Sequence, residues 1–169
     1  MRGFFLLFLV SFFAGCSLKT PTHNELNSRA LSLALQSLSS SVSKEDAQNV
    51  ANLSYKVSKE LNNKFQRSSS PMFHNFLVNI GLKSNGLCYE YANELLEALR
   101  VLGPKSLNIY SVVSKKGEYF EHNALLVTSK EELNNGVILD PWRSANPLFW
   151  IDLSKDRYNW RVVKKQQKD

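Results

Sequence analysis

Residues 86–140 constrain the fold more than any other part of the chain, because a helix-like run is followed there by two strand-like runs. Residues 89–101 combine helix-forming residues with apolar side chains at helical spacing. Residues 119–128 and 136–140 are rich in β-branched, aromatic and aliphatic residues, and the polar residues between them are typical of a loop. The pattern predicts a helix followed by an antiparallel hairpin.

Cys88 stands at the head of the predicted helix. The unpaired N–H groups and aligned peptide dipoles at a helix N-terminus favour an anion, so we expect the thiolate of Cys88 to be stabilised over the thiol. Gly86, two residues earlier, permits a tight turn into the helix. The position suits a nucleophilic thiol.

His122 and Asp140 lie on the two strands of the predicted hairpin. If Val127 pairs near Asn135, Asp140 is directly opposite His122, with Cβ atoms about 4.5 to 5.5 Å apart. The carboxylate could then accept a hydrogen bond from the imidazole. A register shifted by one residue would turn Asp140 to the other face of the sheet.

Each of these residues also has a purely structural interpretation. Cys88 could be a small buried hydrophobic residue, and His122 a hydrogen-bonded strand histidine. Asp140 precedes Pro141 and could simply open a turn. Their order along the chain, with two of the three on one hairpin, favours a nucleophile, a base and a residue that orients the base. His74 is a rival base, but it lies in a predicted helix over residues 72–80, where a surface or capping role is commoner.

These motifs resemble the transglutaminase-like superfamily of papain-fold thiol enzymes. The resemblance covers about residues 73–150 and depends on the Gly-x-Cys helix start at Cys88, a strand His at 122 followed by small and apolar residues, and Asp140-Pro141 closing the next strand. It implies an α+β fold in which N-terminal helices accompany a Cys-bearing core helix packed on an antiparallel β-sheet. It also implies that Cys88 is the nucleophile, His122 the base and Asp140 the orienting residue of an acyl transfer through a thioester. Many members carry an aromatic residue directly after the His, where this chain has Asn123.

The oxyanion of such a reaction needs hydrogen-bond donors close to the thiol. The backbone N–H of Cys88 is the first candidate. The second is open between Asn85 and the amide of a neighbouring loop, and for Asn85 we prefer a turn role. No cofactor is expected, and no metal either, because His23, His74 and His122 lack the spacing of metal ligands.

The N-terminus resembles a bacterial lipoprotein signal. Arg2 is followed by an apolar run over residues 4–13 and by Phe13-Ala14-Gly15-Cys16, and the run is shorter than the about 20 residues that span a membrane. The resemblance implies a signal peptide over residues 1–15, a lipid on Cys16 and, with Ser17 next, sorting to the outer membrane of a cell envelope, facing the periplasm. Because Leu is usual where this chain has Phe13, cleavage without lipidation and an uncleaved anchor stay open. A lipid on Cys16 would leave Cys88 without a disulfide partner.

The remaining chain has the size of one domain. Removing residues 1–15 from the 169-residue chain leaves 154 residues, enough for one sizeable core. Residues 16–26 are expected to form a tether and residues 27–169 a single domain. Within that domain, helices are predicted over 27–38 and from 44 to about 61, a break over 66–71, and further strands over 106–113, 150–153 and 159–163.

The charge pattern bears on the partners. The formal net charge is +6, and basic residues gather after Arg161. For an envelope protein, contact with anionic lipid, cell-wall polymer or solvent explains this cluster better than nucleic acid does.

The leading hypothesis is a lipid-anchored cysteine peptidase or amidase that acts on a protein or peptide. One alternative is a catalytically inactive binding module that uses a groove lined by Trp142, Phe149 and Trp150, although these aromatic residues could equally belong to the core. The other alternative is a structural envelope lipoprotein.

Overall fold

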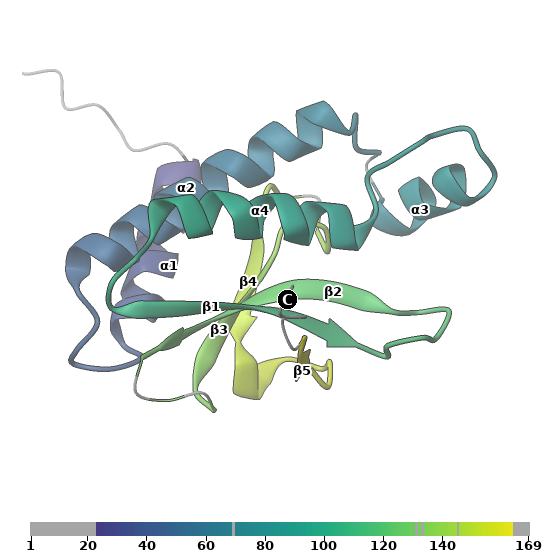
Figure 1. Ribbon diagram of the computed structural model, residues 1–169. Coiled ribbons are helices and arrows are strands. Elements are labelled where there is room, and N and C mark those ends of the chain that lie inside the picture. Colours follow the sequence, from purple (N-terminus) through teal and green to yellow (C-terminus); the bar gives the residue numbers. More distant parts are fainter. Residues whose placement is uncertain (1–22, 69, 131, 133, 145, 164–169) are drawn as a thin grey trace, which may run out of the picture.

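The computed structural model describes residues 23–68, 70–130, 132, 134–144 and 146–163 (Figure 1). The predicted signal peptide, Cys16 and residues 16–22 of the predicted tether lie outside these residues. The tether prediction was wrong at its end, because the first helix already begins at His23. Within the described ranges, none of the helices combines the length and apolar character needed to cross a membrane.

The fold is α+β, and among the described residues four α-helices precede the strands. They are α1 (His23–Gln36), α2 (Lys44–Lys64), α3 (Pro71–Asn79) and α4 (Cys88–Leu102). The predicted start of the second helix is confirmed, since the Ser43 hydroxyl accepts a hydrogen bond from the Asp46 N–H at 3.0 Å. The Cys helix ends one residue after its predicted end at 101, where Gly103 caps it in the left-handed conformation at φ +61°.

The described strands form one antiparallel sheet in the order β4-β3-β2-β1-β5. They are β1 (Leu107–Ser114), β2 (His122–Ser129), β3 (Gly136–Asp140), β4 (Phe149–Asp152) and β5 (Arg161–Val162), and a 3-10 turn, η1 (Leu153–Lys155), follows β4. The predicted strands are confirmed to within a few residues. The largest difference is at β2, where Tyr119 and Phe120 belong to the loop before the strand.

The predicted register of the hairpin was wrong by two residues. Val127 pairs with Val137 instead of a residue near Asn135, and the last β2–β3 pair toward the site is Leu125 with Leu139. A shift by two keeps every side chain on its face, so the apolar pattern alone could not distinguish the two registers. Asp140 is therefore a diagonal neighbour of His122, on the same face, where the two strands part.

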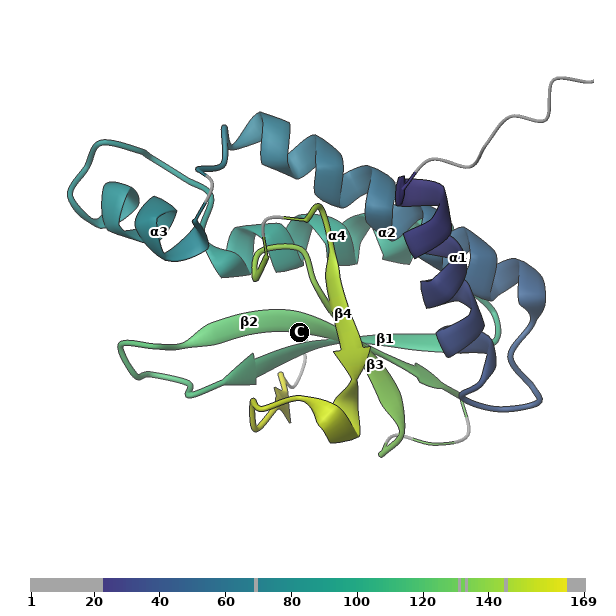
Figure 2. The same cartoon turned by 180° about the vertical axis from the view of Figure 1, so that it is seen from behind.

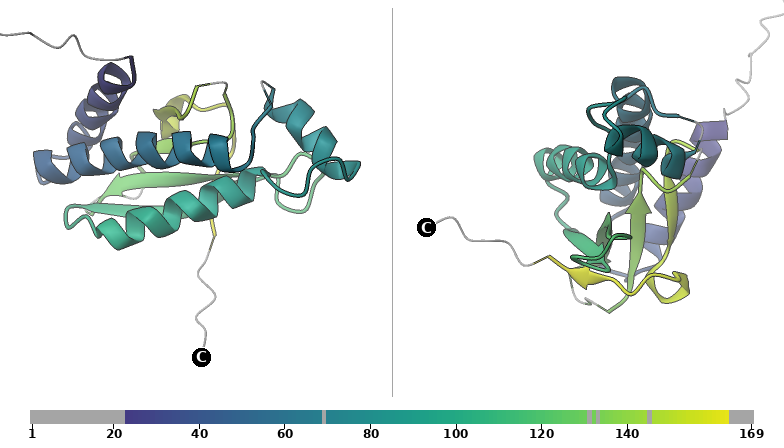
Figure 3. Two further views of the ribbon diagram at one scale, coloured as in Figure 1. Left: turned by 90° about the horizontal axis from the view of Figure 1, so that it is seen from above. Right: turned by 90° about the vertical axis from the view of Figure 1, so that its right-hand side faces the viewer.

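Three helices cover one face of the sheet. In Figures 1 and 3, α2 and α4 lie side by side over the sheet, with α1 crossing near one end. Every second residue of the central strands packs against these helices, as expected for a sheet that is buried on this side. The core between helices and sheet includes the buried side chains of Leu31, Leu35, Val50, Ala51, Leu95, Leu99, Leu125, Val127, Val137 and Leu139.

The opposite face carries a smaller core that the chain after β4 covers. Val112, Ala124, Leu126 and Ile138 are buried there, and Leu153 and Trp160 pack on them. Figure 2 shows η1 and β5 on this side of the sheet. Helix α3 stands apart from the helical layer, beyond the N-terminal end of α4 (Figures 1 and 2).

Candidate functional site

Cys88 is the first residue of α4, as the sequence predicts. The turn before it is held by Glu90, whose Oε2 accepts hydrogen bonds from the backbone N–H groups of Gly86 and Leu87, both at 2.8 Å. Gly86 has φ +98°, and a Cβ there would lie 2.3 Å from His74 Nε2. Only glycine therefore fits this turn, for two independent reasons.

His74 is buried, so the predicted surface or capping role was wrong. Its Nδ1 accepts a hydrogen bond from the Ser68 N–H at 3.2 Å, which leaves Nε2 to donate to the Asn85 carbonyl at 2.9 Å. Both ring nitrogens are thus occupied in holding the loop before Cys88. This arrangement does not suit a base, and it gives the Asn85 carbonyl a part in holding the turn.

His122 and Asp140 form a buried hydrogen-bonded pair. His122 Nε2 lies 2.6 Å from Asp140 Oδ2, His122 is 3% exposed and Asp140 is fully buried. The predicted partnership is therefore present, although the two residues are diagonal neighbours. With Nε2 turned to Asp140, the imidazole has Nδ1 left for a second partner.

The sulfur of Cys88 is the other group that acts on the imidazole. Burial by itself would lower the pKa of His122, but hydrogen bonds to Asp140 and to Cys88, with the charges of both groups, raise it to about 9. His122 is therefore protonated at neutral pH and poised beside the sulfur. Cys88 is free of a disulfide and half-buried, and its Sγ lies 3.9 Å from the Glu121 carbonyl.

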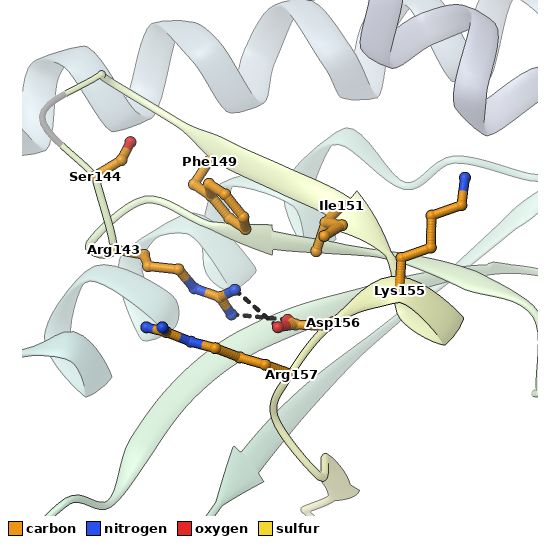
Figure 4. Close-up of a pocket in the computed structure, with 7 residues that line it drawn as sticks. All are labelled: Arg143, Ser144, Phe149, Ile151, Lys155, Asp156 and Arg157. Atoms are coloured by element: carbon orange, nitrogen blue, oxygen red, sulfur yellow. Dashed lines mark hydrogen bonds and ion pairs between the residues drawn. The ribbon is translucent and has the colours of Figure 1, made fainter.

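Arg143 extends the site behind Asp140. Its Nε donates to Asp140 Oδ2 at 2.7 Å, and its two terminal nitrogens donate to the carboxylate of Asp156 at 2.9 and 2.8 Å (Figure 4). Asp140 Oδ1 also accepts from the backbone N–H groups of Trp142 and Arg143, at 3.2 and 3.0 Å. With His122 itself, four donors therefore bind the Asp140 carboxylate. Positive and negative side chains alternate in the order His122, Asp140, Arg143 and Asp156.

Aromatic rings enclose the imidazole and the guanidinium. The ring centroid of His122 lies 5.2 Å from that of Trp142, 5.1 Å from that of Tyr158 and 5.7 Å from that of Trp160. The Arg143 guanidinium stacks over Phe149 at 4.4 Å. These rings exclude water from the ion pairs and strengthen them.

The aromatic residues considered for a binding groove divide between site and core. Trp142 lies beside His122, and Phe149 packs on Arg143. Trp150 instead packs against the core under the helices, where its indole N–H donates to the Tyr55 hydroxyl at 3.1 Å.

Two donors lie close to the sulfur. Within the described part of the chain, the backbone N–H of Cys88 donates to no acceptor. The side-chain amide of Asn123 places Nδ2 3.9 Å from Sγ and 3.2 Å from Glu121 Oε1. Asn123 is the residue at which this chain departs from the aromatic of the resembled superfamily, so that departure puts a polar donor at the thiol.

A cavity of about 440 Å³ opens beside His122. Helix α3 provides one wall and the loop before β2 the other, and Trp142 and Tyr158 contribute from the aromatic enclosure. Its lining consists of Met72, Asn75, Phe76, Asn79, Ile80, Tyr119, Phe120, Glu121, His122, Trp142 and Tyr158. A reactant could therefore reach the imidazole from outside.

Sequence reasoning identified Cys88, His122 and Asp140 but missed Arg143 and Asp156, and it noted Asn123 without its contact to the sulfur. Their positions carry little local signal, since Arg143 follows the strand end and Asp156 lies in a polar turn.

Among the described residues, no group of three or more His, Cys, Asp and Glu side chains is arranged to hold a metal ion. A comparison of the chain with protein-family models, curated proteins and solved structures found no match.

Proposed function

We propose that this protein is a thiol hydrolase of amide bonds, a cysteine peptidase or amidase, with Cys88 as nucleophile, His122 as general acid and base, and Asp140 as orienting residue. One observation carries the proposal. The imidazole of His122 pairs with the carboxylate of Asp140 at 2.6 Å, and the sulfur of Cys88 lies close enough to contribute, with Asp140, to the raised pKa of His122. A thiol, an imidazole and a carboxylate in this order are what nucleophilic catalysis by cysteine needs.

The reaction begins with the sulfur as thiolate and the imidazole protonated. Cys88 Sγ attacks the carbonyl carbon, and the oxygen gains the negative charge of the tetrahedral intermediate. The N–H of Cys88 and the amide of Asn123, whose Nδ2 lies 3.9 Å from the sulfur, would donate to that oxygen. When the C–N bond breaks, His122 gives its proton to the leaving amine, and a thioester on Cys88 remains.

Deacylation reverses these roles. His122, now neutral, takes a proton from water as the water oxygen attacks the thioester carbonyl. The C–S bond breaks, the acid is released, and the thiolate and imidazolium are restored. Asp140, held by Arg143, keeps the imidazole in place while its charge changes.

The wider assignment is part of the same proposal. The α+β architecture, with a Cys-headed helix packed on an antiparallel sheet, supports membership of the transglutaminase-like, papain-fold superfamily. A lipid on Cys16 would hold the domain at the bacterial envelope, facing the periplasm, where proteins or peptides are its substrates. The chain up to residue 22 would then connect the lipid to α1.

Hydrolysis of a fluorogenic peptide library by the purified chain tests the proposal. We expect cleavage that disappears in Cys88→Ala and falls at least a hundredfold in His122→Gln. Val101→Ala, at an exposed position near the other end of α4, is the matched control and should cleave like the wild type. Cleavage that persists in Cys88→Ala would refute a thiol mechanism, and binding of peptides without turnover would favour the inactive binding module.

A further inference from the structure

Helix α3 has an unusual distribution of its side chains. Its buried residue is His74, while the large apolar side chains of Met72 and Phe76 are 55% and 53% exposed, and Ile80 at its C-terminal cap is 50% exposed. An amphipathic helix of a globular domain ordinarily turns its apolar side inward. Here Met72, Phe76 and Ile80 line the cavity beside His122, while Phe73, 53% exposed, lies outside its lining.

The opposite wall of the cavity is aromatic and also exposed. Tyr119 and Phe120 are 85% and 57% exposed, and their rings meet edge to face at a centroid distance of 5.0 Å. Two apolar walls from separate parts of the chain thus face one another. Contiguous exposed apolar surface of this kind marks a binding site more often than scattered single residues do.

The charge of the cavity narrows the class of ligand. Its lining contains no Lys or Arg, and its carboxylate is Glu121. Hydrogen bonds from the Gly117 N–H and the Asn123 amide lower the pKa of Glu121, so it is ionised at neutral pH. His122, the cation of the lining, is already paired with Asp140. A carboxylate side chain would lose its hydration between the apolar walls next to Glu121, whereas an apolar side chain would be buried there, with the amides of Asn75 and Asn79 available to a peptide backbone.

The position of the cavity relative to the proposed chemistry indicates which part of a substrate it holds. His122 lines the cavity and Cys88 does not. In the proposed mechanism, the acyl group is bonded to the sulfur, and the imidazole gives its proton to the leaving amine. The amine side of the scissile bond therefore lies on the imidazole side of the site, at the mouth of the cavity.

From these observations we propose that the cavity binds a large apolar or aromatic side chain on the amine side of the scissile amide, in the residue that directly follows the bond. Its volume of about 440 Å³ lies within the range of about 300–1,000 Å³ that is usual for ligand pockets. The inference rests on the proposed function, because it takes the thioester on Cys88 as given.

The reverse use of the site provides the test. An amine that occupies the cavity should compete with water for the thioester: its nitrogen attacks the carbonyl carbon, a C–N bond forms, the C–S bond breaks, and the proton of the amine passes to His122. The full chain is acetylated with p-nitrophenyl acetate, and deacylation is followed with phenylalaninamide, glycinamide or aspartate α-amide as acceptor. Intact mass and peptide mapping show whether the acetyl group is on Cys88.

We expect phenylalaninamide to trap the acetyl group at least tenfold more efficiently than glycinamide, and aspartate α-amide to be the poorest acceptor. Phe76→Ser and, separately, Ile80→Ser should remove most of this preference. Leu33→Ser, at a 58% exposed position on α1, is the matched control and should keep it. Thermal unfolding of each variant shows that its fold is retained.

The outcomes separate this inference from the proposed function. Failure of Cys88 to form an acetyl thioester would refute the proposed function itself. A thioester that forms but is taken by the three amines equally, or by aspartate α-amide best, would overturn the cavity assignment alone. Dimerisation in analytical ultracentrifugation that Phe76→Ser abolishes would also overturn it, because a second copy would then cover the walls.

Discussion

The raised pKa of His122 predicts that the stability of the protein depends on pH through this one residue. The imidazole is 3% exposed, so the surrounding charges are little screened by solvent. Its pKa is about 9 in the folded protein and 6.5 in the unfolded chain. At about 1.4 kcal/mol per pKa unit, this difference corresponds to roughly 3 kcal/mol of stability from the protonated ring.

The direction of the effect follows from the raised value. The folded protein holds the proton more tightly than the unfolded chain, so the contribution is complete below pH 6.5. It is lost progressively as the pH rises from 6.5 to about 9. In His122→Gln this contribution is absent at every pH.

Urea unfolding of the wild type and of His122→Gln between pH 6 and pH 9.5 measures the effect. The difference between the two free energies of unfolding should decrease by about 3 kcal/mol over this range, while titrations elsewhere cancel. Asp140→Asn should lose most of the pH-dependent part, and Cys88→Ala should keep some of it, because both residues contribute to the raised pKa. Curves for wild type and His122→Gln that run parallel across the range would refute a protonated His122.

Three further predictions concern the surroundings of the site. Asn123→Ala should lower kcat on peptide substrates by tenfold or more with a smaller change in KM, because it removes a donor to the oxyanion; an unchanged kcat would exclude this role. Arg143→Met should lower the free energy of unfolding by about 3–5 kcal/mol, measured by urea unfolding, since it leaves two carboxylates without their buried partner; a loss under 1 kcal/mol would contradict this. Gly86→Ala should destabilise the protein and slow alkylation of Cys88, because its Cβ collides with His74; Gly81→Ala, also at positive φ but with open space around the Cβ, should cost less.

The sequence predicted the elements of this fold better than their alignment. Helix starts at Ser43 and Cys88 and the stop at Gly103 are local signals, so they could be read from the chain. The β2–β3 register could not, since a shift by two residues leaves the apolar pattern unchanged. The register depends on how many residues separate the two strands, and the polar sequence between them does not specify one length.

For the candidate site, the residues with a chemical signature were predictable and their supports were not. Cys88, His122 and Asp140 belong to recognisable chemistry at element ends. Arg143 and Asp156 hydrogen-bond to each other only once the chain after β4 has folded back behind Asp140. This tertiary contact has no local sequence pattern. His74 shows the opposite error, because nothing in the sequence around this helical histidine indicated that its partners are backbone groups of Ser68 and Asn85.

The rate at which Cys88 is alkylated, followed as a function of pH, tests the central claim most directly. Peptide mapping after brief exposure to iodoacetamide follows Cys88 separately from Cys16. We predict that Cys88 is alkylated at least tenfold more slowly in His122→Gln than in the wild type over the range from pH 6 to pH 8. Rates that are slow and equally pH-dependent in both proteins would mean that the imidazole does not activate the sulfur, and would contradict the account.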